Sequence, residues 1–385
     1  AQCGFCTPGF VMSLYALTCA GAKPDHQTIN DAFAGNLCRC TGYGPLIAAA
    51  ETALLTSPAA WEAERLTAER NQLETLQLGT MTEPCAPVAD ARGSCAFRPA
   101  TADEFAQLYV DTPDATVIAG ATDVGLWVTK QAQRLTTTIH MSGVDDLRYV
   151  TRTDSTLQIG AAATYAELMP QIESAYPDFG ELLRRIGAVQ VRSTGTLCGN
   201  VANGSPIGDT PPALIALGAE MTLRKGSDRR KIPVEDFFIA YGQQDRSPGE
   251  FVEAIEIPLL DDPDQLKCYK ISKRFDQDIS AVCGCFNVSI KDGQVAAARI
   301  AYGGMAATPL RARAVENALI GQSWTSTTID NATKAYADDF APITDMRATA
   351  RYRLRVATNL LEKYFHETQQ PLSLTRLVGH GAAIT

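Results

Sequence analysis

The stretch Cys3-Gly4-Phe5-Cys6, followed after 31 residues by Cys38-Arg39-Cys40, decides how the N-terminal part of the chain folds. Four thiolates from two short pairs can close a tetrahedral sulfur site, and soft thiolates select zinc or iron–sulfur clusters. One turn presents both sulfurs of a C-x-x-C pair. In an extended C-x-C pair, residues i and i+2 point the same way. Each pair could therefore hold one iron of a [2Fe–2S] cluster.

Two other interpretations compete for the same cysteines. Zinc also takes four thiolates, although its common spacings pair C-x₂-C with a second C-x₂-C at shorter range. A thioredoxin-like redox pair is the third interpretation, but no βαβ unit surrounds Cys3 and Cys6. The spacing alone leaves all three open.

The residues around these cysteines predict helices over 10–17, 28–33 and 45–53, the last with proline in its first turn. Residues 57–95 are polar and punctuated by proline, which indicates a linker. A further helix is expected within it, around 62–76.

The composition excludes several classes of protein. The chain has 385 residues, which predicts two or three domains. Its net charge of −9 disfavours nucleic acid or an anionic membrane as the partner. No run is long and apolar enough to span a bilayer, and no signal peptide is recognisable. The 11 cysteines, clustered at one end, then suggest metal or redox work in a reducing, cytoplasmic setting.

Beyond residue 97 the pattern mixes strands and helices without a strict βαβ period, which favours an α+β fold over a doubly wound sheet. Strands are expected over 115–120, 157–161, 219–224, 270–273, 281–290 and 296–301, and helices over 182–186 and 352–365.

A first glycine-containing segment runs over 117–125 and is typical of a strand that enters a tight anion-binding turn. Glycine lets the backbone approach a diphosphate, whose oxygens the exposed N–H groups satisfy. Gly120 and Gly125 have Walker-like spacing, but Leu126 stands where a P-loop needs lysine. An ordinary turn fits this segment equally.

A second segment, 194–209, is dense in Gly, Asn, Thr and Ser. Small donors and an unencumbered backbone suit wrapping around a ribityl chain and a diphosphate. The alternative is a long surface loop, and loops of that length are usually functional or disordered. The apolar residues Leu197, Val201 and Ile207 argue against disorder.

The segments Gln2–Gly9 and Asn36–Tyr43 resemble, almost residue for residue, the helical [2Fe–2S] domain of the molybdenum hydroxylases. The resemblance implies that the iron ligands are Cys3, Cys6, Cys38 and Cys40. It also implies that Gln2 and the Cys40 region face a molybdopterin on a partner subunit. The family places a ferredoxin-type cluster domain upstream. This sequence lacks it and starts at Ala1 without methionine, so we expect the natural chain to be longer.

The two glycine-containing segments together resemble the FAD domain of the same family, a fold of the vanillyl-alcohol oxidase type, over about 97–259. The residues that the resemblance implies for flavin binding are Val117, Ile118, Ala119, Gly120, Ala121, Thr122, Asp123, Val124, Ile186, Thr196, Gly199, Asn200, Asn203, Asp209, Val252 and Lys270. Asn203 departs from the pattern because some relatives carry threonine there.

The loop 270–280 looks like the one that approaches the flavin in the xanthine dehydrogenase branch, although as a cluster of charges it could simply be solvated. By the same resemblance, Tyr241 and Asp278 would lie near the nicotinamide and the flavin. Residues 300–311 resemble the family's C-terminal flavoprotein domain.

The implied fold class is a multidomain α plus α+β chain. It would comprise a helical [2Fe–2S]-binding domain over 1–60, a linker over 61–95, an FAD-binding domain over 96–262, and an α+β C-terminal flavoprotein domain over 263–375. No nucleophile–base arrangement is recognisable on this chain, which fits an electron-transfer subunit whose chemistry belongs to its cofactors.

The implied function is electron transfer in purine oxidation. A partner subunit carrying molybdopterin would oxidise hypoxanthine or xanthine, and electrons would pass through [2Fe–2S] and FAD to NAD⁺ within an (αβ)₂ heterotetramer. Relatives that oxidise aldehydes, nicotinate, carbon monoxide or acyl-CoA compounds are alternatives, as is a zinc-stapled binding module without a redox role. Of the remaining cysteines, Cys19, Cys283 and Cys285 are expected to be packed in the core.

Overall fold

The structure is a computed structural model that describes residues 2–21, 25–56, 60–77, 85–89 and 93–376. The chain divides into two compact units. The N-terminal unit comprises 1–85 with 187–191, and the C-terminal unit comprises 86–186 with 192–385. Among the described residues, no helix is long and apolar enough to cross a membrane.

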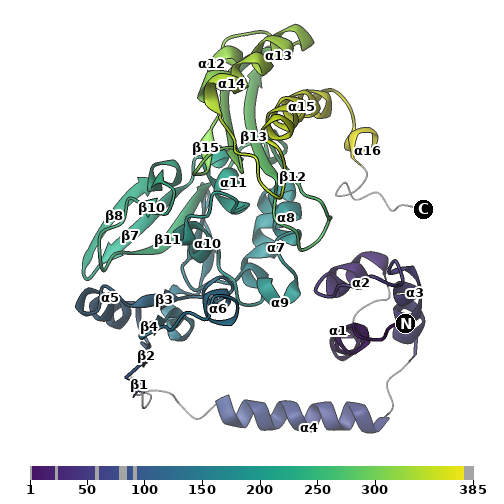
Figure 1. The fold of residues 1–385 in the computed structure, drawn as a ribbon, viewed down its shortest axis with the longest axis vertical. Helices are drawn as coiled ribbons and strands as arrows, with labels where there is room; N and C mark the ends of the chain where they lie inside the picture. Colours follow the sequence, from purple (N-terminus) through teal and green to yellow (C-terminus); the bar gives the residue numbers. More distant parts are fainter. Residues whose placement is uncertain (1, 22–24, 57–59, 78–84, 90–92, 377–385) are drawn as a thin grey trace. The chain divides into compact units, whose positions relative to one another are not determined.

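In the N-terminal unit, three helices pack around a small apolar core (Figure 1). They are α1 (Thr7–Cys19), α2 (His26–Phe33) and α3 (Gly44–Leu54). Phe10 and Phe33 meet edge to face at 5.0 Å between ring centroids, a favoured aromatic geometry. The predicted helices over 10–17, 28–33 and 45–53 are confirmed.

The ends of these helices follow from local sequence. The side chain of Asp25 accepts a hydrogen bond from the Thr28 amide at 2.9 Å and caps α2. The predicted linker helix is also present, as α4 (Ala60–Gln77). Cys19 is exposed at the end of α1, so the expectation that it lies in the core was wrong.

The first part of the C-terminal unit is a four-stranded sheet in the order β1-β2-β4-β3, in which β2, β4 and β3 run parallel. Its elements are β1 (Cys85–Ala89), β2 (Cys95–Arg98), α5 (Ala102–Asp111), β3 (Thr116–Ile118), α6 (Val124–Thr129) and β4 (Thr137–His140). The 3₁₀ turns η1 (Met141–Gly143) and η2 (Asp145–Leu147) follow.

The second sheet is antiparallel, with five strands in the order β5-β6-β11-β7-β8. Its strands are β5 (Val150–Arg152), β6 (Thr156–Gly160), β7 (Glu220–Lys225), β8 (Asp228–Pro233) and β11 (Phe251–Pro258). A small hairpin of β9 (Phe238–Ala240) and β10 (Gln243–Gln244) follows the 3₁₀ turn η3 (Val234–Phe237). Ile255 and Ile257 alternate with Glu256 along β11, so one face of the sheet is apolar and buried.

Five helices interrupt this sheet in the sequence, and one of them carries the predicted flavin residues Gly199, Asn200 and Asn203. They are α7 (Tyr165–Ala175), α8 (Pro177–Arg184), α9 (Val189–Arg192), α10 (Leu197–Asn203) and α11 (Thr210–Leu217). α8 ends at Arg184, so the prediction of a helix as far as Ile186 was wrong at its end. Every residue of α11 is buried, because the helix is apolar all round.

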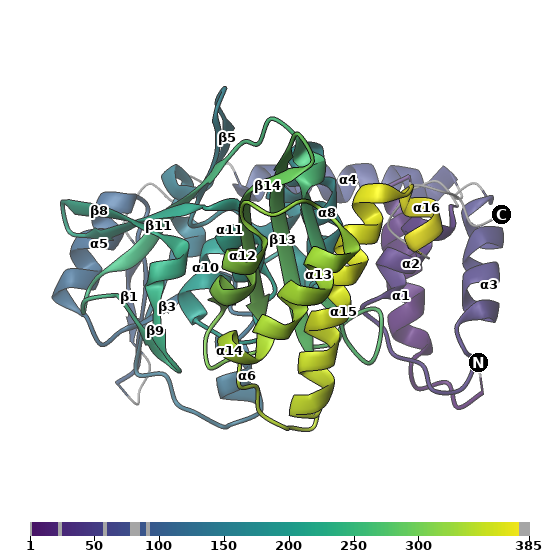
Figure 2. The same ribbon diagram turned by 90° about the horizontal axis from the view of Figure 1, so that it is seen from above.

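The last sheet, in the order β12-β13-β14-β15, is antiparallel and lies between two layers of helices (Figures 1 and 2). Its strands are β12 (Leu266–Ile271), β13 (Val282–Lys291), β14 (Gln294–Gly303) and β15 (Leu310–Arg311), preceded by the 3₁₀ turn η4 (Pro263–Gln265). The helices that follow are α12 (Arg313–Leu319), α13 (Ser326–Ala332), η5 (Thr333–Ala335), α14 (Tyr336–Asp339), α15 (Ala350–Gln369) and α16 (Leu372–Thr375).

Each face of this last sheet belongs to a different core. Tyr269, Phe286 and Ile300 pack with the C-terminal helices. Cys283 and Cys285, one residue out of phase with Phe286, pack instead with α11 in the core that includes the five-stranded sheet, as the alternation along a strand requires. The prediction that these two cysteines are core residues is confirmed.

Candidate functional site

The four cysteines of the two N-terminal motifs come together at the start of α1 and before α3. The side chain of Cys3 interacts with that of Cys40, and the side chain of Cys6 interacts with that of Cys38. The structure therefore pairs sulfurs across the two motifs, whereas the spacing had suggested that sulfurs of the same motif pair.

Cys38 is the most strongly activated of these thiols. The hydroxyl of Thr41 lies 3.2 Å from its sulfur, and the amide of Cys40 donates to that sulfur at 3.4 Å. These hydrogen bonds favour the thiolate and lower the pKa of Cys38 to about 7. A thiolate is the form that binds a metal.

This arrangement fits a two-iron cluster in its donor set. Two pairs of sulfurs suit two irons better than one zinc. The hydroxyl of Thr7, directly after Cys6, is buried without a hydrogen-bond partner among the residues that the structure describes.

Apolar side chains surround the cysteine loops on the outside of the N-terminal unit. Phe5 is 94% exposed, and Val11, Met12 and Leu37 are also exposed. The amide group of Gln2 donates to the Cys40 carbonyl at 3.0 Å, which fixes the two motifs to each other. Exposed apolar surface of this kind marks contact sites, and it is compatible with the expectation that Gln2 and the Cys40 region face a partner.

The two glycine-containing segments meet in the C-terminal unit. β3 carries Val117 and Ile118, and the turn 119–123 leads into α6. A β-carbon at Gly120 would overlap the carbonyl oxygen of Thr194, so only glycine allows this approach. The structure thus brings the residues expected at the diphosphate beside the start of the second segment.

The second segment is not the long surface loop that was the alternative for it, because residues 197–203 form the short helix α10. Thr196 caps the helix and accepts a hydrogen bond from the Gly199 amide at 3.0 Å. Asn203 closes the last turn before Gly204, whose φ of 64° is left-handed. Glycine is the residue that adopts this conformation readily.

The side chain of Asn200 is oriented by a buried threonine. Thr210 donates its hydroxyl proton to Asn200 Oδ1 at 2.5 Å, and this leaves the amide Nδ2 of Asn200 as the group available to a ligand.

A buried ion pair links the second segment to the last sheet. Lys270 Nζ on β12 donates to Asp209 Oδ2 at 2.5 Å and to Ser280 Oγ at 3.0 Å. Ser280 in turn donates to Asp209 Oδ1 at 2.5 Å. The side chains of Lys270 and Asp209 are 2% and 8% exposed. Asp209 also directly precedes α11, where a negative charge is favoured by the helix dipole.

The other predicted contacts are positioned less directly. Val252 is buried in β11, and Ile186 lies against the same core after the end of α8. Asp278 accepts a hydrogen bond from the Arg274 amide at 2.8 Å and so closes its own loop. Tyr241 is 76% exposed in the turn between β9 and β10. β10 contacts the C-terminal end of α10, since Gln244 donates to the Ala202 carbonyl at 3.1 Å.

Three site residues were missed by the sequence reasoning. Ser280 completes the buried pair, Thr210 orients Asn200, and Arg185 holds the loop 270–280. The guanidinium of Arg185 lies 4.3 Å from the ring centroid of Phe275 and donates to the Lys270 carbonyl at 3.0 Å. Only Ser280 was within a segment already singled out. The other two give no signal before the chain is folded.

The geometry of this region fits a flavin dinucleotide. Gly120 shows the close backbone approach that a diphosphate needs, Thr196 caps the start of α10, and the Nδ2 group of Asn200 is available as a donor. Neither a helix N-terminus nor a glycine alone identifies a ligand, but these groups and the buried Lys–Asp pair together suit a polar cofactor.

We expect Gly120→Ala to weaken FAD binding. The added methyl group would force apart the two segments that meet at Thr194. Overpacking of this kind costs about 1–3 kcal/mol, and a cost of that size taken from binding would weaken FAD affinity about 5- to 150-fold. Flavin fluorescence titration measures it. Gly44→Ala, where the new methyl group meets open space in α3, is the control. Equal FAD affinity in both variants would contradict the assignment of Gly120.

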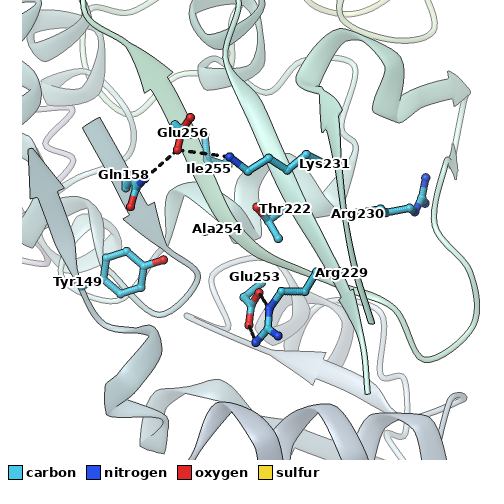
Figure 3. Close-up of a pocket in the computed structure, with 10 residues that line it drawn as sticks. All are labelled: Tyr149, Gln158, Thr222, Arg229, Arg230, Lys231, Glu253, Ala254, Ile255 and Glu256. Atoms are coloured by element: carbon cyan, nitrogen blue, oxygen red, sulfur yellow. Dashed lines mark hydrogen bonds and ion pairs between the residues drawn. The ribbon is translucent and has the colours of Figure 1, made fainter. Parts of the chain in front are cut away.

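A separate pocket lies on the outer face of the five-stranded sheet (Figure 3), with a volume of about 290 Å³. Four of its charged side chains pair with one another, and Arg230 pairs with Asp245 and Glu250 beyond the pocket. Lys231 lies 3.5 Å from Glu256, and Arg229 donates to Glu253 at 2.6 Å. The pocket contains none of the predicted flavin or cluster residues.

Three protein families match the chain in succession. Residues 1–51 match a [2Fe-2S] binding domain, residues 91–260 the FAD binding domain in molybdopterin dehydrogenase, and residues 267–368 the CO dehydrogenase flavoprotein C-terminal domain.

Curated relatives match nearly the whole chain at low identity. A xanthine dehydrogenase of Emericella nidulans is 27% identical over 95% of this chain, and xanthine dehydrogenase 2 of Arabidopsis thaliana is 28% identical over 88%. A nicotinate hydroxylase of Emericella nidulans is 25% identical over 97% of the chain. The chain spans 30–35% of the length of these three relatives.

Solved structures share the fold over 70% of the chain. A carbon monoxide dehydrogenase from Hydrogenophaga pseudoflava is 25% identical, with a TM-score of 0.65 over 70% of this chain and 94% of its own. Quinoline 2-oxidoreductase from Pseudomonas putida 86 is 23% identical, with a TM-score of 0.64 over the same shares, a likeness that concerns the fold alone.

Proposed function

We propose that this chain is part of a xanthine dehydrogenase. The premise is that it belongs to the molybdenum hydroxylase family, in which it is the iron–sulfur and flavin part that transfers electrons. In this proposal it receives electrons from a molybdopterin-bearing partner subunit during hypoxanthine or xanthine oxidation and delivers them to NAD⁺. The protein would be cytoplasmic and would form an (αβ)₂ heterotetramer with that partner.

The observation that carries the proposal is the match to xanthine dehydrogenases along almost the full chain, 27% identical over 95% in Emericella nidulans. Both cofactor-type regions lie within that match. The nicotinate hydroxylase relative is the specific reason to keep a second substrate in view, since its match covers 97% of the chain.

The chain's own residues would hold the two cofactors. Cys3, Cys6, Cys38 and Cys40 would bind the [2Fe–2S] cluster, and the turn after β3 would hold the FAD diphosphate. Asn200, Asp209 and Lys270 would orient the flavin through polar contacts. When bound, a flavin exchanges electrons singly or in pairs, whereas an iron–sulfur cluster passes one at a time. The domain boundaries near 60, 95 and 262 belong to this proposal as well.

Two parts of the surface would form the site where NAD⁺ approaches the flavin. Tyr241, 76% exposed beside the last turn of α10, and the loop that contains Asp278 would approach a nicotinamide. Arg185 keeps this loop in place through its stacking on Phe275. In this proposal, reduction of NAD⁺ requires that its nicotinamide reach the flavin past these residues, and it requires no catalytic base from this chain.

The test is cofactor analysis of the purified complex followed by substrate-dependent NAD⁺ reduction. We expect iron and FAD in stoichiometric amounts and NADH formation with xanthine. Nicotinate, an aldehyde and carbon monoxide serve as competing substrates, and oxygen as the competing acceptor. If NADH forms faster with nicotinate than with xanthine, nicotinate is the substrate and the xanthine assignment is wrong. A colourless protein with stoichiometric zinc would overturn the electron-transfer role altogether.

A further inference from the structure

A single threonine hydroxyl contacts a predicted cluster ligand. Thr41 Oγ1 lies 3.2 Å from the sulfur of Cys38, three residues away, and the same oxygen accepts a hydrogen bond from the Tyr43 amide at 3.2 Å. Both contacts lie within the short turn that joins the second cysteine motif to α3.

The direction of the hydrogen bond to sulfur follows from the state of the ligand. A cysteine bound to iron is a thiolate and has no proton to donate. The Tyr43 amide has a proton but no acceptor site, so the Thr41 oxygen accepts there and keeps its own proton free. With a cluster bound, the donor in the contact between these two atoms is therefore Thr41, and the acceptor is the Cys38 sulfur.

The turn holds Thr41 in this position from two sides. Tyr43 adopts a φ of 69°, which is unusual for a residue other than glycine. Its hydroxyl accepts a hydrogen bond from the Cys38 amide at 3.1 Å, and its ring packs on Phe10 at 6.2 Å between centroids. Tyr43 thus fixes Cys38 through its side chain and Thr41 through its backbone, so little ordering is left for cluster binding.

We propose that the Thr41 hydroxyl donates a hydrogen bond to the Cys38 sulfur of the bound [2Fe–2S] cluster and thereby raises the reduction potential of that cluster. Reduction adds negative charge, part of which resides on the ligand sulfurs, so a donor to sulfur stabilises the reduced form more than the oxidised form. Thr41 is a positioning residue that sets the driving force for electron transfer. This inference rests on the proposed cluster at these cysteines.

The experiment compares Thr41→Val, which removes the hydroxyl and nearly keeps the shape, with Thr41→Ser, which keeps the hydroxyl. Iron content is measured first, and the midpoint potential of the cluster is then measured by a redox titration followed by electron paramagnetic resonance. We expect full iron content in both variants, a lower midpoint potential in Thr41→Val, and an unchanged one in Thr41→Ser. Thr52→Val is the matched control, because the Thr52 hydroxyl on α3 bonds only to the Ala48 carbonyl.

The other outcomes are decisive. A Thr41→Val protein with full iron and an unshifted potential would overturn the proposal. If Thr41→Val and Thr41→Ala both lose iron while Thr41→Ser keeps it, the hydroxyl serves cluster assembly instead of tuning, and the proposal is wrong. Failure of the proposed function itself is distinct, because unaltered protein would then carry no iron.

Discussion

Replacing Cys38 with serine is expected to remove the iron–sulfur absorbance while FAD stays bound. Cys38 is the buried thiol whose pKa is lowered to about 7, and its side chain interacts with that of Cys6. A serine hydroxyl stays protonated near neutral pH and offers a hard oxygen where iron–sulfur chemistry selects soft thiolates. Iron and flavin are measured separately on the same purified sample.

Loss of the cluster should also interrupt electron transfer from the substrate to the flavin. Substrate-dependent NAD⁺ reduction should fall by orders of magnitude, whereas reduction of the flavin by added NADH should persist, because the predicted flavin residues lie in the C-terminal unit. Cys19→Ser is the matched control, since Cys19 is exposed at the end of α1 and outside the ligand set. Unchanged iron content in Cys38→Ser would remove these cysteines from the cluster.

The cluster ligands could be predicted from the sequence because their constraint is local. Two sulfurs of one motif lie within a few residues, and the helices that carry them have clear boundaries. The partner of each sulfur was not predictable, because Cys3 and Cys40 meet only when α1 and α3 pack. Cys19 was misjudged for a related reason: α1 is apolar on nearly all sides and buries only Phe10, so its sequence shows no distinct core face.

The flavin region was predicted as two segments but not as one assembled site. Thr194 and Gly120 are 74 residues apart, and nothing in the pattern indicates that one carbonyl oxygen fills the place of a β-carbon at the other. The helix α10 was missed because its Gly, Asn and Cys residues have weak helix propensity. The Thr196 cap and the burial of Val201 stabilise this helix despite its low intrinsic helix propensity.

Ser280 could not be predicted either, because it meets Asp209 and Lys270 only in the folded chain. Lys270→Met should lower the free energy of unfolding of the C-terminal unit and reduce FAD content. The change leaves the Asp209 carboxylate, 8% exposed, with Ser280 but without its cation. Breaking a buried pair from one side costs about 3–5 kcal/mol. Denaturant unfolding and flavin content measure the two effects, with Lys291→Met at an exposed position of β13 as control.

A second variant separates folding from flavin binding. In Lys270→Met with Asp209→Asn neither position carries a charge, so the free energy of unfolding should recover most of the loss. If Lys270 and Asp209 also contact the flavin, FAD content should stay low in this double variant although the protein is stable again. Recovery of both properties together would mean that the pair supports the fold alone. If Lys270→Met keeps the stability and the FAD content of the unaltered protein, the ion pair supports neither the fold nor flavin binding. In that case the Asp209 carboxylate must be hydrated, because a buried carboxylate without its cation would destabilise the core.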